Sequence, residues 1–194
     1  MTDIANTPIK ICSRASILMG GSPIQSFTDG TAESTVAEAL YEDVARAALT
    51  NTRWRFASDQ AILNRLSDKP TGRWDAAYQM PHNLLMLSAL TINENRIKYD
   101  TYGDKCYTNA QSNDDVVADF IFRADEVNWP SYFTLAVEFS MASVLAVSVA
   151  RDLQMSELME QKGGRQMMLA RRLESQSQTT RKLTTSRFLA ERRS

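Results

Sequence analysis

Residues 129–151 read WPSYFTLAVEFSMASVLAVSVAR, and this stretch decides the fold. Proline is tolerated in the first turn of a helix, because the amide hydrogen that it lacks would have no intrahelical acceptor there. From Tyr132 to Ala150 the residues are apolar on nearly every side, which is typical of a helix buried in a core or an oligomer. Its most apolar part, FSMASVLAVSVA, covers only 12 residues, whereas a membrane span needs about 20. We therefore expect a central packed helix and no membrane segment.

Two further helices are expected before this one. The first has apolar residues at helical spacing between residues 11 and 19, and the GGSP turn at 20–23 ends it. The second begins near Asp29 or Thr31, either of which can cap it. Its predicted buried stripe consists of Val36, Leu40, Val44, Ala47 and Ala48.

The segment between the second helix and the central one carries period-two patterns. Residues 52–66 alternate and are predicted as a strand or extended arm, whereas residues 67–83 are irregular and punctuated by proline and glycine. VVADFIFRA, at 116–124, places Phe120 and Phe122 on one face. The other expected strands are LLMLSALTI at 84–92 and a hairpin at 96–109 that turns at Gly103-Asp104. These patterns predict a small antiparallel sheet inserted at about residues 84–124.

A last helix starts near Leu153 and is predicted to be interrupted at Gly163 and Gly164. Two adjacent glycines cost about 2 kcal/mol relative to alanine in a helix interior, so we expect a bend and a hinge there. The predicted fold class is mainly α, a helical bundle with a small inserted antiparallel β-sheet or hairpin and an extended basic C-terminal tail. We expect one domain at residues 1–175 and a tail at 176–194, disordered when free because it is polar.

Charge is unevenly distributed along the chain. The formal net charge of the 194 residues is -1, so no global field attracts nucleic acid or membrane. Residues 1–160 hold 13 basic and 21 acidic side chains, whereas residues 161–194 hold 9 basic and 2 acidic ones. The last fifteen residues, TRKLTTSRFLAERRS, contain five of these bases. The sequence therefore describes an acidic body with a basic tail.

Reactive groups are few. His82 is the only histidine, and Cys12 and Cys106 lack metal-type spacing, so we expect a loop histidine and two free thiols in a reducing compartment. No nucleophile elbow, phosphate loop, dinucleotide fingerprint or metal cluster is present in the sequence. Four methionines either line an adaptable contact surface or pack between helices: Met155, Met159, Met167 and Met168. Four aspartates in two pairs either serve acid–base chemistry or stabilise turns: Asp100 with Asp104, and Asp114 with Asp115. No catalytic role and no cofactor are expected.

Several segments occur in an order that is moderately specific. These are ILMGGSPIQSF, EALYEDVARAALTNTRWRFA, GRWDAAYQMPHNLLML, GDKCYT and NWPSYFTLAVEFSMASVLA. Together they resemble the head-to-tail connector adaptors of tailed bacteriophages, the group that includes the tail tubular protein A type. The shared features are the Trp54–Ala57 pattern W-x-F-A after the second helix, a segment ending at Pro81, and Trp129-Pro130 before the apolar helix. The resemblance covers residues 9–175, and the glycine pair at 163–164 departs from it.

The resemblance implies a structural virion protein made in the host cytoplasm and placed at the head–tail interface. It implies a ring, typically dodecameric, that lies beneath the portal and joins it to the tail nozzle or other tail proteins. Genomic DNA would pass through the channel without sequence-specific binding, and no active site, cofactor, metal or membrane is implied. The inserted sheet would reach toward neighbours or tail proteins, and the C-terminal segment would dock on the portal.

Three interpretations of the basic tail stay open from the sequence: docking on the portal, contact with phosphates of DNA in the channel, and a solvated tail that keeps the monomer soluble. The nucleic-acid interpretation is the main alternative function, and a hydrolase or nuclease using the aspartate pairs is a third. The hinge residues expected are Gly163 and Gly164. The portal-docking residues expected are Arg181, Lys182, Leu183, Arg187, Phe188, Leu189, Arg192 and Arg193.

Overall fold

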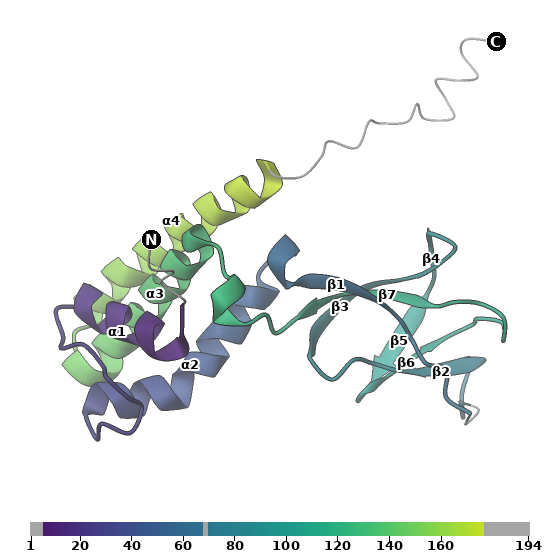
Figure 1. Cartoon of the computed structure of the whole chain (residues 1–194), viewed down its shortest axis with the longest axis horizontal. Coiled ribbons are helices and arrows are strands. Elements are labelled where there is room, and N and C mark those ends of the chain that lie inside the picture. The colour runs from purple at the N-terminus through teal and green to yellow at the C-terminus, as the bar shows by residue number, and fades with distance from the viewer. Residues whose placement is uncertain (1–5, 68–69, 177–194) are drawn as a thin grey trace, which may run out of the picture.

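The computed structural model describes residues 6–67 and 70–176, and Figure 1 shows a helical part at one end and a β part at the other. The helices of these ranges are α1 (Pro8–Leu18), α2 (Ala32–Thr50), α3 (Ser131–Leu145) and α4 (Leu153–Gln176). The strands are β1 (Ser58–Ile62), β2 (Ala76–Gln79), β3 (Leu84–Ile92), β4 (Asn95–Arg96), β5 (Tyr99–Tyr102), β6 (Lys105–Thr108) and β7 (Val117–Phe122).

The expectation of a mainly α helical bundle is wrong. Helices account for 47% and strands for 21% of the structure, so the fold is a mixed α/β fold with four helices and seven strands in the described ranges. The strands begin at Ser58, well before the predicted start of the insertion, and form two antiparallel sheets. Most of these strands are only two to six residues long, and such short runs leave a weak pattern in the sequence.

The two sheets enclose a core of their own. The first has the order β1-β7-β3-β4 and the second the order β2-β6-β5. Leu90 and Phe120 of the first sheet and Tyr78 and Cys106 of the second are buried in one cluster. Strand β7 links this cluster to the helices, because Phe120 belongs to the β core whereas Ile121, on the opposite face, belongs to the helical core.

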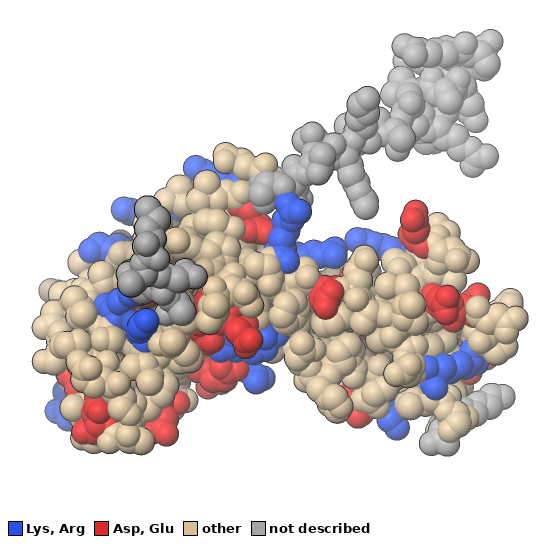
Figure 2. Space-filling model, in the orientation of Figure 1, with Lys and Arg blue, Asp and Glu red and all other residues tan. Residues whose placement is uncertain are grey.

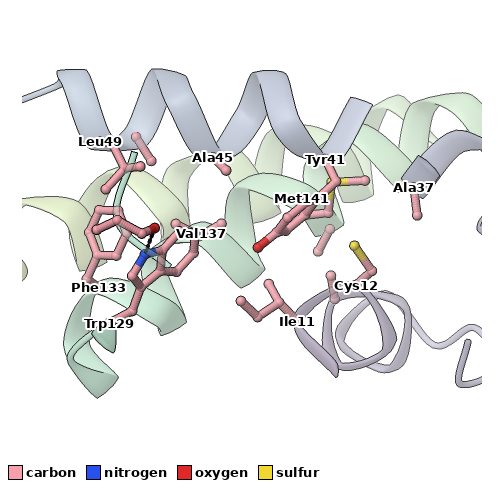
Figure 3. Packing of buried hydrophobic residues seen from close by; sticks show 14 of the residues in the cluster. Ile11, Cys12, Ala37, Tyr41, Ala45, Leu49, Trp129, Phe133, Val137 and Met141 are labelled. Carbon is pink, nitrogen blue, oxygen red and sulfur yellow. Dashed lines mark hydrogen bonds between the residues drawn. The ribbon is translucent and has the colours of Figure 1, made fainter. Parts of the chain in front are cut away.

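Helix α3 lies at the centre of the helical part and packs against the three other helices. Phe133, Val137 and Met141 of α3 are fully buried, and Figure 3 shows them facing α2 and α1. By length and composition alone, Ser131–Ala150 could cross a membrane, and half of that stretch is buried in the described structure. Burial on several sides agrees with a core helix, and a stability test of that assignment is given below.

Threonines cap the N-termini of α1 and α2, and Thr31 is one of the two caps predicted for the second helix. The side chain of Thr7 accepts a hydrogen bond from the backbone N–H of Lys10, and Thr31 accepts one from that of Ser34. Each threonine therefore satisfies one of the backbone donors left free at a helix start. After α1, Gly20 has a φ of 86°, a left-handed conformation that suits glycine.

The buried stripe predicted for α2 is wrong. The helix buries a neighbouring stripe instead, which consists of Ala37, Tyr41, Ala45, Ala48 and Leu49. Leu40 and Ala47 are exposed, and Val36 and Val44 are only half-buried. Val36 and Val44 pack only against the edge of the helical core, and Ala48 is the one buried residue of the predicted stripe.

Helix α4 is continuous across Gly163 and Gly164, so the predicted interruption is wrong. Gly163 is buried, and a Cβ atom there would lie 3.4 Å from the Cβ of Phe139 and from the Oγ of Ser140. Gly164 has open space where a side chain would go. Gly163 therefore permits close contact between α3 and α4, whereas a hinge role during assembly is not tested and stays a prediction.

A network of charges joins the helices to the sheets. The guanidinium of Arg123, which follows β7, donates to both oxygens of Glu42 on α2 and to Glu126. The hydroxyl of Tyr41 donates to the same oxygen of Glu126 at 2.9 Å. The guanidinium also lies 5.5 Å from the ring centroid of Trp129, at the start of α3. This network fixes α2 against the end of β7.

A second junction lies where α2 leads into β1. Trp54 is fully buried and donates from its indole nitrogen to the carbonyl of Ala48 at 3.0 Å. The carboxylate of Glu174, near the end of α4, accepts from the backbone N–H of Arg55 and from the hydroxyl of Tyr132, each at 2.7 Å. The last turn of α4 is therefore tied both to α3 and to the segment that enters the sheet.

Candidate interaction surfaces

The eight residues predicted to dock on the portal lie outside the described residues. The described chain ends at Gln176, two residues after Glu174. Because Glu174 is held by two hydrogen bonds, the tail follows a helix end that is fixed on the body. The described part of α4 thus sets where the tail begins, and the sites inside the tail stay predictions.

A groove of about 430 Å³ lies between α2, α3 and α4. Its lining includes Val44, Ala47, Val144, Glu160, Gly164 and Met167. The small residues of all three helices leave the groove open, and the glycine pair forms part of the α4 wall. At one end, Arg171 of α4 donates a hydrogen bond to Asn51, the residue that follows α2. The predicted hinge residues therefore line a surface groove.

Three carboxylates lie at or near this groove, one of them in its lining. Glu160 lines it, and Asp43 is exposed beside Val44 on α2. Glu157, exposed on α4, is one turn away from Glu160, since residues three apart are neighbours on a helix. None of these three carboxylates forms a salt bridge with another described residue. We call this surface the acidic groove: Asp43, Val44, Ala47, Val144, Glu157, Glu160, Gly164 and Met167.

A different surface runs along the other flank of α4. Leu158, Leu169 and Leu173 are each 45–46% exposed and lie on the same flank of the helix, and grouped exposed apolar residues are candidates for a contact surface. Lys162, Arg165 and Arg172 are exposed between them and form no salt bridge with another described residue. These positions recur at i, i+4, i+7, i+11, i+14 and i+15, so they follow one helix face. We call this surface the basic stripe: Leu158, Lys162, Arg165, Leu169, Arg172 and Leu173.

The methionines divide between packing and exposure. Met159 is buried in the helical core, whereas Met168 is 54% exposed. Met155 and Met167 are half-buried, and Met167 also lines the acidic groove. Met159 therefore packs between helices, whereas Met168 is available for contact with another molecule.

The far end of the second sheet carries an aromatic cluster. Asp100 of β5 accepts hydrogen bonds from the guanidinium of Arg73 and from the indole nitrogen of Trp74. The Tyr102 and Tyr107 rings meet edge to face with centroids 5.6 Å apart. Asp100, one of the aspartates considered for catalysis, thus orders the segment before β2. Asp114 accepts from the backbone N–H of Gln111, as a turn aspartate does.

The cysteines and the histidine form no reactive site with one another. Cys12 and Cys106 are free and fully buried in separate cores. Burial raises the pKa of Cys12 to about 12 and that of Cys106 to about 11, because the thiolate would lose its hydration. His82 is exposed in the turn before β3. Among the described residues, no group of three or more His, Cys, Asp or Glu side chains could hold a metal ion.

Charges of opposite sign occupy different parts of the helical body. In Figure 2, Lys and Arg gather over its upper edge, where α4 runs, and Asp and Glu over its lower edge, where α2 begins. The helical body therefore presents surfaces of opposite charge. No protein-family model matches the chain, and a search of curated proteins also gives no match.

Helical spacing in the sequence indicates these surfaces only in part. The apolar spacing from Val36 to Ala47 on α2 predicts a buried stripe, whereas Leu40 and Ala47 are exposed. On α4, the spacing of the leucines with the bases at 162 and 165 is visible in the sequence, but spacing alone does not say that this face is exposed. A helix that carries two apolar stripes in its sequence can bury one stripe in the core and leave the other for contact with another molecule.

Proposed function

We propose that the chain is a structural adaptor of a tailed-bacteriophage virion. It forms a ring beneath the portal and joins the portal to the tail, as the order of its sequence motifs implies. The single observation that carries the proposal is the pairing of an acidic body with a basic tail that follows the fixed end of α4. Around a ring, every copy would present its tail at the same height, and repeated weak contacts add by avidity.

The arrangement of the two parts supports this role. The helical part carries the exposed apolar faces that a ring wall needs, and the β part extends away from it (Figure 1). At the end of the second sheet, Trp74, Tyr102 and Tyr107 line one pocket together with Arg73. Tyrosine, tryptophan and arginine are the residues most enriched at the energetic centres of protein interfaces. This end of the sheet is the surface proposed to meet the tail proteins.

The tail is proposed to dock on the portal through both charge and apolar contact. Exposed ion pairs contribute only about 0–1 kcal/mol each, so the five bases between Arg181 and Arg193 are insufficient alone. Leu183, Phe188 and Leu189 add about 1.5–3 kcal/mol apiece when buried, before ordering costs. The anchor Phe188 therefore matters more than any single arginine.

Truncation after Ser175 tests the proposal. The truncated chain retains Glu174 and should unfold at the temperature of the full chain, yet it should lose binding to purified portal rings. Phe188→Ala should weaken portal binding more than Arg187→Ala does. Normal portal binding by the truncated chain would rule out the docking role.

The same variants separate this proposal from DNA binding. If the tail binds phosphates, Arg187→Ala should weaken duplex binding more than Phe188→Ala. The affinity of the full chain for a plain duplex should then fall steeply between 50 and 200 mM salt, as counterions compete for the phosphates. Tight, salt-sensitive duplex binding without portal binding would favour the nucleic-acid alternative.

A further inference from the structure

Helix α2 carries two neighbouring apolar stripes, and the second is covered only in part inside the described fold, where Val36 and Val44 pack against the edge of the helical core. Ala37, Tyr41 and Ala45 face the core. Leu40 and Ala47 are exposed on the neighbouring stripe, where Val44 lines the acidic groove. An apolar stripe that stays open to solvent on a helix already packed through another face is a candidate contact surface. The groove beside it can accept apolar side chains from outside.

The basic stripe has the complementary chemistry. Its leucines are of a size to enter the groove, and its bases are opposite in sign to Asp43, Glu157 and Glu160. At about 100° per residue, Gly164 of the groove and Leu169 of the stripe point about 140° apart around α4. The two surfaces therefore lie on different flanks of the same helix, and one copy cannot bring them together.

We propose that the acidic groove of one copy binds the basic stripe of a second copy. Two grooves facing each other would oppose carboxylates, and two stripes would oppose bases, so pairing of like surfaces is disfavoured. A contact between two different surfaces is head-to-tail, and repetition of such a contact gives a ring or a filament. This inference rests on the proposed function, for which it names the contact between neighbours in the ring.

One other occupant of the groove would have similar chemistry. The tail of the same chain also combines bases with apolar residues, and about twelve residues separate the end of α4 from Phe188. The exposed leucines of α4 decide against it, because tail binding in the groove leaves them without a partner. A truncated chain ending at Gln176 distinguishes the two occupants.

The test uses two variants that each block one surface. Ala47→Arg places a bulky positive charge at the groove, and Leu169→Asp places a negative charge on the stripe. Both residues are exposed, so the fold should be kept. Each variant alone should weaken self-association of the full chain at least about tenfold in sedimentation equilibrium, because like charges then face each other. Ile62→Asp, on an exposed residue of β1, is the matched control and should leave association unchanged.

Mixing the two blocked variants gives the decisive result. The Ala47→Arg chain keeps its stripe and the Leu169→Asp chain keeps its groove, so the mixture should regain the 1:1 association that neither variant shows alone. A photoreactive residue at position 169 of the Ala47→Arg chain should cross-link to α2 of its partner. Cross-links between two α4 helices, or no dimers in the mixture, would overturn the proposal.

Two further outcomes also overturn it. One is a full chain that stays monomeric at about 1 mM, since a specific contact should bind more tightly than that. The other is loss of self-association in the chain ending at Gln176, which would assign the groove to the tail. Portal binding is measured separately. A chain that self-associates through these surfaces but ignores portal rings would refute the proposed function and leave this contact standing.

Discussion

Arg123 is the residue whose removal should matter most at the junction of helices and sheets. Its side chain is only 18% exposed and is shared between Glu42 and Glu126. The carboxylate of Glu126 is nearly buried and also accepts from Tyr41. Loss of the arginine would leave this carboxylate in a poorly hydrated site with one hydrogen bond fewer.

Arg123→Leu should therefore lower the free energy of unfolding by about 3 kcal/mol, the cost typical of breaking a buried pair from one side. Arg73→Leu is the control, because Arg73 pairs with Asp100 but is 73% exposed, and its loss should cost clearly less than the loss of Arg123, since exposed ion pairs contribute little. Urea denaturation of both variants measures the difference. Equal losses would mean that the Arg123 network contributes no more than a surface pair.

Glu42 should make the protein sensitive to acid. Its hydrogen bonds from Arg123 hold the pKa of this carboxyl below its usual value. Stability from this group is complete above the unfolded pKa of about 4.3 and is lost as the pH falls through the folded pKa. Glu42→Gln should therefore flatten the decline in unfolding free energy below that pH, measured by urea denaturation at several pH values.

Glu138 should change the pH dependence of stability in the opposite direction to Glu42, and it therefore serves as the comparison. Burial raises the pKa of its carboxyl, although Arg14 donates to it at 3.0 Å. The folded state therefore binds this proton more tightly than the unfolded state, and the group adds stability as the pH falls. Glu138→Gln should make the acid decline steeper. Identical pH profiles for both variants would contradict these assignments.

At the scale of elements, the sequence predicts the strands that alternate or turn tightly. The strand at residues 84–92 is confirmed as β3, and the hairpin at Gly103-Asp104 is confirmed as β5 and β6. Strand β2 was missed, because Ala76, Ala77 and Tyr78 are all buried and no polar residue alternates with them. The 52–66 prediction was too long, since residues 55–57 form a 3-10 turn before β1. A strand buried on both faces carries no period-two signal.

The contact surfaces were harder to predict than the strands for a different reason. Periodicity identifies apolar stripes on a helix but does not say which one faces the core. On α2 the buried residues include three alanines together with Tyr41 and Leu49, and the small alanines let α2 approach α3 and α1 closely. Val44 is shared between the edge of the core and the groove, whereas Leu40 is exposed. Only tertiary packing decides between two stripes that lie so close together.

The two glycines in α4 allow a comparison between the helix propensity of alanine and the contacts that its Cβ would make. Gly164→Ala should raise the free energy of unfolding by about 1 kcal/mol, since alanine favours the helix and nothing lies within 4 Å of the new Cβ. Gly163→Ala should gain less, because its Cβ would meet Phe139 and Ser140. Thermal unfolding of the two single variants measures this difference.

The double alanine variant tests the hinge. A stiffer helix that weakens attachment to portal rings, with normal stability of the free chain, would support a joint at this place. Normal attachment with higher helicity by circular dichroism would show that the glycines serve packing and the groove alone.

Helix α3 should tolerate no charge on its buried face. Leu145 is fully buried, and an unpaired carboxylate there would cost several kcal/mol. Leu145→Asp should therefore unfold the protein in aqueous buffer, as seen in the far-UV circular dichroism spectrum. Val147→Asp is the control, because Val147 is 43% exposed and should leave the melting temperature nearly unchanged. Unchanged stability of Leu145→Asp would refute a packed α3.

At the scale of the whole molecule, Glu174 couples the two parts. It holds the backbone of Arg55, where the chain enters the first sheet, and the hydroxyl of Tyr132 on α3. Burial and the hydrogen bond to Glu174 raise the pKa of Tyr132 to about 12. A hydrogen bond to a charged group contributes about 1.5–3 kcal/mol, so Glu174→Ala should cost about 2 kcal/mol.

A sharper test of this coupling is which backbone amides lose protection when Glu174 is replaced. Hydrogen exchange in Glu174→Ala should accelerate at the amides of residues 55–58 and in the last turn of α4, whereas the centre of α3 should stay protected. Glu174→Gln keeps one acceptor and should give a smaller change. Uniform acceleration over the whole chain would indicate general destabilisation without a specific coupling.

The order of the elements along the chain has a consequence for synthesis. Helices α1 and α2 precede the strands and α3 follows them, so about 80 residues separate the first two helices from the one that completes their core. At about 5–20 residues per second, a ribosome needs about 4–16 s to supply that stretch. During this interval Tyr41 and Leu49 have no core to enter, and the first sheet can close only once β7, which lies between β1 and β3, has been made. The nascent chain is thus most exposed to misfolding, and most in need of a chaperone, before residue 131 leaves the ribosome.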